Sequence, residues 1–216
     1  MTTKTLELDC RFCSQVAKAN GQDPIGSAGT YDHWIIAEIP QPWPTTIWKE
    51  HPIVAPVMAI VQSLREQGIS VRPLMIAPDR NASHPDKTRL FYYRRPTHHF
   101  ATFDKQEFIL PTADVVPLVT ALLQQPDHLP QFEAYRQPTD HIRELFVCVH
   151  GNVDVACSRF GYPIYQHLNK TYAVEWKRDS LPPPSPHLPT SPPPHLPPPR
   201  LALFPLWRAQ LCPHPD

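Results

Sequence analysis

Glycine and long apolar runs are both scarce in this chain. It has 6 glycines against 30 prolines in 216 residues. No stretch reaches the roughly eighteen consecutive apolar residues of a membrane-spanning helix. The first residues, MTTKTLELDCRFC, lack the apolar centre of a secretory signal. These absences predict a protein that neither crosses a membrane nor is exported, and we expect it to be cytoplasmic.

An excess of charge of one sign is also missing. Lys plus Arg and Asp plus Glu each number 20, so the formal net charge is zero. Such a chain has no net field to attract a polyanion. We therefore expect no nucleic-acid partner and no anionic membrane surface as a partner.

Cysteine is infrequent and odd in number, with five residues. This count fits a reducing compartment, in which thiols bind metals or pack in the interior. Cys10 and Cys13 form a C-x-x-C before a short helical stretch, as in a thioredoxin-type redox pair. Two alternatives stay open: a metal site that joins them to later cysteines, and ordinary N-terminal residues without a role.

Apolar runs alternate with amphipathic stretches, which predicts an α/β protein. Residues 34–39 are continuously apolar and predict a strand buried on both faces. Residues 53–67 keep one apolar face and predict a helix that ends at Gly68. A strand follows over 69–77, where Pro73 indicates an edge or a bulge. The order predicts a β-α-β unit in a mixed sheet.

Further elements continue the same pattern. A strand is predicted at 90–93, and a pair of short apolar runs around 104–106 resembles a hairpin. Thr112 or Asp114 should cap a second amphipathic helix, and 131–141 reads as a polar linker. His98 and His99, adjacent in a basic connection, are expected in a solvated loop.

The stretch from Leu145 to Tyr165, LFVCVHGNVDVACSRFGYPIY, carries most of the chemical content. Its start predicts a strand with Cys148 near the C-terminal end, and Cys157 falls at a helix start. The positive end of a helix favours thiolate, the form that binds metal. The alternative is that both cysteines simply pack, because free cysteine is often buried and C-x8-C is not a common zinc spacing.

The pattern Cys148-x-His150-Gly151-x-x-Asp154-x-x-Cys157-x-x-x-Gly161 resembles the motif of the sucrase/ferredoxin-like family. Softer similarity extends upstream, and the resemblance covers roughly residues 10–173. It implies a thioredoxin-like ferredoxin fold with a mixed sheet and flanking helices. It also implies a [2Fe-2S] cluster held by two cysteines and two histidines, with Cys148 and Cys157 in the thiolate positions.

The histidine half of that ligand set has no counterpart here. In the family it follows as an H-x3-H in a glycine-rich element, and none occurs after Leu168. His187 and His195 stand about 25 Å apart if the intervening chain is polyproline II. His150 is the nearer candidate ligand, with a turn-capping role as its alternative. We therefore predict that the chain binds the cluster weakly or not at all.

The C-terminal segment differs in composition from the rest. Fourteen of the 30 prolines and no glycines lie after Ser180. Proline lacks a backbone donor, so polyproline II or disorder is expected. The sequence thus predicts an N-terminal α/β half at 1–142, an incomplete ferredoxin domain at 143–179 and a disordered proline-rich tail at 180–216. The abrupt change indicates a truncated or frameshifted end; an interaction segment is the alternative.

The leading functional hypothesis is an electron carrier with a redox protein partner. A thiol-disulfide oxidoreductase using Cys10 and Cys13, or a non-redox interaction protein with a proline-rich tail, are the alternatives. Sucrose hydrolysis would need two carboxylates flanking the scissile bond. No acid pair in the sequence implies that geometry, and Asp154 is better interpreted as a loop or cap residue.

Overall fold

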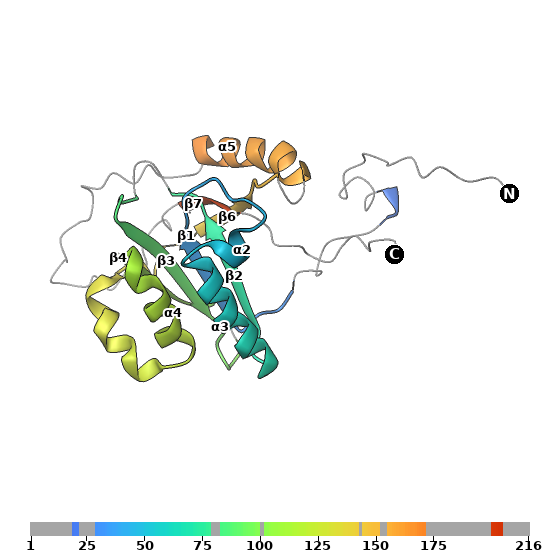
Figure 1. Ribbon diagram of the computed structural model, residues 1–216. Coiled ribbons are helices and arrows are strands. Elements are labelled where there is room, and N and C mark those ends of the chain that lie inside the picture. Colours follow the sequence, from blue (N-terminus) through green and yellow to red (C-terminus); the bar gives the residue numbers. More distant parts are fainter. Residues whose placement is uncertain are drawn as a thin grey trace, which may run out of the picture.

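A five-stranded mixed sheet forms the centre of the molecule. The computed structural model describes residues 19–21, 29–78, 83–99, 102–142, 144–151, 155–171 and 200–204. The sheet has the strand order β2-β1-β3-β4-β5 (Figure 1). Its strands are β1 (His33–Glu38), β2 (Val71–Ile76), β3 (Lys87–Arg94), β4 (Asp104–Pro111) and β5 (Arg136–Gln137).

The predicted β-α-β unit is confirmed. β1 pairs parallel with β2 and antiparallel with β3. α3 (Val54–Glu66) connects the two parallel strands, after the short α2 (Ile47–Glu50). Pro73 lies opposite Ile35 on β2, an edge strand, where a missing N–H is tolerated. Gly68 follows α3 with φ +83°, a conformation that favours glycine.

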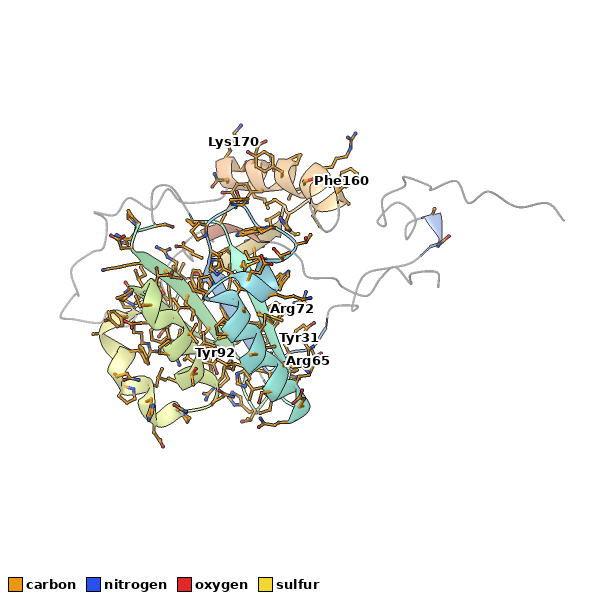
Figure 2. The ribbon with its side chains drawn as sticks, viewed as in Figure 1. Tyr31, Arg65, Arg72, Tyr92, Phe160 and Lys170 are labelled. Carbon is orange, nitrogen blue, oxygen red and sulfur yellow. The ribbon has the colours of Figure 1, made fainter. Side chains whose placement is uncertain are left out.

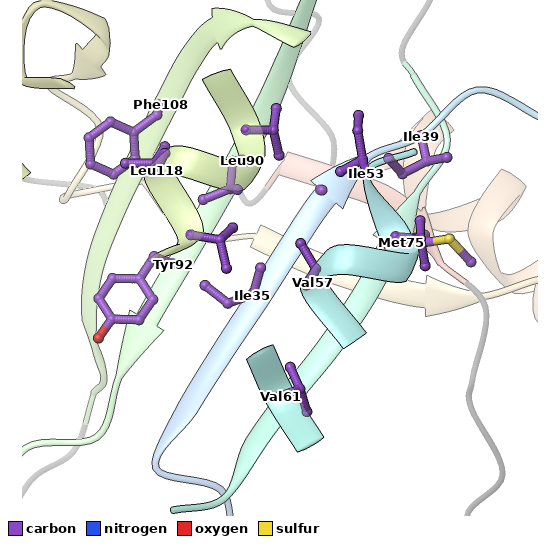
Figure 3. Packing of buried hydrophobic residues seen from close by; sticks show 14 of the residues in the cluster. Ile35, Ile39, Ile53, Val57, Val61, Met75, Leu90, Tyr92, Phe108 and Leu118 are labelled. Atoms are coloured by element: carbon purple, nitrogen blue, oxygen red, sulfur yellow. The ribbon is translucent and has the colours of Figure 1, made fainter. Parts of the chain in front are cut away.

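One face of the sheet carries the main apolar core. α3, α4 (Val115–Leu123) and the 3-10 helix η2 (Pro126–Tyr135) cover this face. Their buried side chains interdigitate with alternate residues of the strands (Figure 3). Those strand residues include Ile35, Leu90, Tyr92, Phe108 and Leu110. Burial of this face supplies most of the hydrophobic stabilisation of the fold.

A second layer covers the opposite face. There Ile36, Leu74, Ile76 and Phe91 form a smaller buried cluster, against which Phe146 packs. Phe146 belongs to β6 (Glu144–Cys148), which pairs parallel with β7 (Arg200–Phe204). The π-type turn η3 (Cys157–Gly161) and α5 (Tyr162–Thr171) lie beyond β6, at the top of Figure 1.

Three local predictions were wrong or incomplete. Residues 104–106 form no hairpin but begin the single strand β4, because their side chains alternate between the faces of the sheet. The expected linker at 131–141 begins inside η2 and includes β5. Asp114 is the N-cap residue of α4 but makes no side-chain capping bond, and the Thr112 hydroxyl lies 3.1 Å from that of Thr88.

The α/β class, with a mixed sheet and flanking helices, is confirmed. Most of the predicted proline-rich tail lies outside the described residues, but Arg200–Phe204 forms a strand that was not predicted. Within it, LALF is an apolar run that follows Arg200 and ends before Pro205, which suits a short strand. Across the described ranges, no helix combines the length and the apolar character needed to cross a membrane.

Candidate functional site

Cys148 and Cys157 are both where the sequence predicted them. Cys148 is the last residue of β6, and Cys157 is the first residue of η3, which continues into α5. Both side chains are half-buried, and neither is part of a disulfide. The strand end and the helix start thus each present one thiol.

Gly161 brings the two elements into contact. A Cβ at this position would overlap the backbone carbonyl of Cys148, so only glycine allows this approach of η3 to the end of β6. η3 is a π-type turn, a feature often found at functional sites. The close packing holds η3, which begins at Cys157, against the end of β6, where Cys148 lies, and we call this contact region the cysteine corner.

A second glycine shapes the turn after β6. A Cβ on Gly151 would lie 2.6 Å from the Oγ of Ser158, one residue past Cys157. The Ser158 hydroxyl donates to the Val155 carbonyl at 3.0 Å, which holds the first turn of the helical segment. η3 therefore packs at two points: near its start, Ser158 lies against Gly151, and at its end, Gly161 lies against Cys148.

His150 is the further candidate ligand that the sequence offered, two residues after Cys148. Both ring nitrogens are buried, and neither has a hydrogen-bond partner among the described residues. Its ring meets Trp43 edge-on, with centroids 5.4 Å apart. The predicted turn-capping role is not seen in these contacts. A buried imidazole without a polar partner costs free energy, so the arrangement leaves donor and acceptor capacity for a ligand.

Trp43 closes the site on the core side. Its side chain is 2% exposed, and its indole N–H donates to the Ile39 carbonyl at 3.0 Å. The buried position is that of a side chain that packs in the core. It shields the imidazole of His150 from water on that side.

The described residues do not by themselves fit a [2Fe-2S] cluster with two cysteine and two histidine ligands. Within the ranges that the structure covers, no group of three or more His, Cys, Asp or Glu side chains is placed to hold a metal ion. The candidates Cys10, Cys13, Asp154, His187 and His195 lie outside those ranges. His98 and His99 are described and lie exposed in the β3–β4 connection, as expected.

The main core also contains a pocket, which is distinct from the two cysteines. A small pocket between α3 and the sheet is lined by residues such as Ile35, Val57, Met75 and Val119. Its lining contains no ionisable side chain. Ligand sites normally combine an apolar wall with a few convergent polar groups, so this pocket has the character of core packing.

Sequence reasoning missed a group of buried charges on the second face of the sheet. Glu38 lies in β1, Arg89 in β3, and Lys105 and Glu107 in β4, and Glu144 begins β6. The period-2 spacing of Lys105 and Glu107 was the available signal. It was overlooked because Asp104–Gln106 resembled a turn.

The comparison with protein families supports the motif. The sucrase/ferredoxin-like family model matches residues 24–183, more than half of the chain. No curated protein and no solved structure matches it. The matched range contains the sheet, both thiols and the two close-packed glycines; this chain belongs to the sucrase/ferredoxin-like family.

Proposed function

We propose that this chain is an electron-transfer protein with a thioredoxin-like ferredoxin fold, whose Cys148 and Cys157 are the thiolate ligands of a [2Fe-2S] centre. The contact of Gly161 with the Cys148 carbonyl carries the proposal, because it brings together the two elements that bear the motif cysteines. Family membership supplies the cofactor class. We propose a redox protein in the cytoplasm as the partner.

The centre proposed here is incomplete in this chain. A [2Fe-2S] cluster with mixed histidine and cysteine ligands has a higher potential than an all-cysteine ferredoxin. The described part of the chain offers two thiols and the His150 imidazole, and the sequence after Leu168 has no H-x3-H. We therefore expect weak, substoichiometric cluster binding.

Anaerobic reconstitution with iron and sulfide tests both statements. We expect visible absorbance with fewer than two irons per chain, and its loss in Cys148→Ala and in Cys157→Ala. The double variant Cys10→Ser/Cys13→Ser is the matched control and should leave the absorbance unchanged.

Each of three outcomes would contradict either the ligand role of the two cysteines or the expectation of weak binding. Absorbance that survives the loss of either Cys148 or Cys157 would rule out their ligand role. A stable cluster with two irons per chain would show that the ligand set is complete. Loss of the signal in the Cys10→Ser/Cys13→Ser variant would move the centre to the N-terminal pair and favour the redox alternative there.

A further inference from the structure

Five charged side chains form a buried chain of ion pairs on the second face of the sheet, and one of them, Glu144, belongs to β6. Glu38 and Glu107 each place a carboxylate oxygen 3.6 Å from the Arg89 Nε. Lys105 lies 3.8 Å from Glu107 and 2.6 Å from Glu144. The five side chains are at most 8% exposed. Charges so deeply buried are stable only when each is paired and hydrogen-bonded.

Lys105 makes its closest contacts with the segment that leads into β6. Its ammonium group donates to the carbonyl oxygens of Thr139 at 2.8 Å and Ile142 at 3.1 Å. The third acceptor is the Glu144 carboxylate, at 2.6 Å. An ammonium has three N–H donors, so these acceptors match its full capacity. A single side chain from β4 thus fixes the connection and the first residue of the cysteine-bearing strand.

Other contacts of β6 come after the Lys105 contact along the strand. The Tyr93 hydroxyl donates to the other Glu144 oxygen at 2.7 Å. Two residues on, the Phe146 ring meets Phe91 and Tyr93 edge-on, with centroids 6.0 and 6.5 Å away. Cys148, a further two residues along, meets Gly161. The strand is therefore held at its start, its middle and its end.

An exposed ion pair between β3 and β4 contrasts with the buried pair of Lys105 and Glu144. Arg94 and Asp104 are direct partners in the β3–β4 ladder, adjacent to the pair formed by Tyr93 and Lys105. They form a salt bridge at 3.1 Å with side chains 61% and 52% exposed. Such a surface pair contributes little, whereas breaking a buried pair leaves an uncompensated charge.

We propose that Lys105 is a positioning residue for the Cys148 thiol: through Glu144, Thr139 and Ile142 it seats β6 on the sheet and so fixes where the strand presents its terminal cysteine. Describing Lys105 as a positioning residue rests on the proposed function, because this description treats Cys148 as a metal ligand. The packing of β6 on the sheet does not depend on that function, and it is measured on the iron-free protein.

Lys105→Met in the full-length chain tests the seating. Hydrogen exchange of the 144–148 amides should become about 100-fold faster, because the variant removes the ammonium that pairs with the buried Glu144 carboxylate. Alkylation of Cys148, followed by peptide-resolved mass spectrometry, should accelerate as well. Exchange at Leu90 and Phe108 in the centre of the sheet should stay unchanged, which a general loss of stability would not allow.

Three further variants keep the test decisive. Arg94→Met, which removes the exposed pair, should leave exchange at 144–148 unaltered. Lys105→Met/Glu144→Gln removes both charges and should recover most of the lost protection. Glu144→Gln alone keeps the shape and the Tyr93 hydrogen bond, and should accelerate exchange by roughly tenfold through loss of the charge-assisted bond. Glu144→Gln replaces Lys105→Met as the test if Lys105→Met fails to fold.

Equal exchange at 144–148 in Lys105→Met and Arg94→Met would overturn the inference, and so would uniform acceleration across the sheet. If Lys105→Met does not fold, unaltered exchange in Glu144→Gln would overturn it. These readouts need no iron. A failure of cluster reconstitution with the exchange pattern as expected would therefore count against the proposed function alone.

Discussion

The central sheet and the β6–α5 segment are stabilised in different ways. Between residues 33 and 142 the apolar side chains are interleaved in a large core, and Phe108 is 1% exposed. The exposed large hydrophobic residues of the described chain all fall between 145 and 164, and Ile164 is 53% exposed. Phe160 and Lys170 mark this segment at the top of Figure 2, away from Arg65 on α3.

The two regions therefore control different properties: the central sheet controls stability, and the β6–α5 segment controls the geometry of the thiols. Burial is non-directional, so the core tolerates small shifts, whereas the cysteine corner depends on a few specific contacts at Glu144, Gly151 and Gly161. Substitutions in the first region should change the free energy of unfolding. Substitutions in the second should change thiol exposure first.

Phe108→Ala should have the largest effect on stability. Removing a fully buried aromatic ring costs about 3–5 kcal/mol through lost burial and the cavity left behind. Urea denaturation should show a lower midpoint, and both regions should unfold together. If the β6 amides exchanged hydrogen as slowly as in the parent protein while the core lost this stability, the central sheet would not support the β6–α5 segment.

High pH should also weaken the core, through Tyr92. Burial raises the pKa of Tyr92 to about 12, and its hydroxyl lies 2.9 Å from the His33 Nδ1. Because the fold favours the neutral hydroxyl, the contribution of Tyr92 to the free energy of unfolding is complete below pH of about 10. This contribution is lost as pH rises toward 12. The complete loss is about 2–3 kcal/mol.

Unfolding curves measured from about pH 8 to about pH 12 check this expectation, because this range lies on both sides of the unperturbed tyrosine pKa. Tyr92→Phe lacks the ionisable hydroxyl and should remove most of this alkaline component. An unchanged alkaline loss in Tyr92→Phe would assign it to other groups.

Gly161→Ala should act on the cysteine corner and spare the core. The added Cβ must displace the end of β6, a local overpacking of about 1–3 kcal/mol. Alkylation of Cys148 and Cys157 should accelerate, with little change in the urea midpoint of the sheet.

Gly68→Ala is the control for the effect of a glycine substitution elsewhere. Gly68 has φ +83°, and a Cβ added there would meet no atom within 4 Å, so alanine strains the backbone without touching the site. Its thiol reactivity should match the parent protein. Slow alkylation in Gly161→Ala would show that the two elements can separate without exposing the thiols.

His150→Phe should have the smallest effect, and of opposite sign. Replacing a buried imidazole that has no hydrogen bond in the described structure by a ring of similar shape should stabilise the iron-free protein by about 1 kcal/mol. Iron retained after reconstitution should fall. Destabilisation would show that the imidazole has a polar partner in the folded protein.

Local pattern was enough for much of the architecture. The apolar run at 34–39, the helix ended by Gly68 and the edge strand with Pro73 all follow from side-chain periodicity and backbone geometry. The positions of Cys148 at a strand end and Cys157 at a helix start were predicted from the same signals. Those features depend on neighbours along the chain.

Tertiary structure alone decided what those elements touch. No spacing indicates that Lys105 meets residues 139, 142 and 144, or that Gly161 lies under the Cys148 carbonyl. The physical reason is that buried charges and close backbone approaches depend on groups brought together across layers of the fold. The sequence by itself determined the elements and the thiols; the packing of β6 on the sheet determined how the thiols are held.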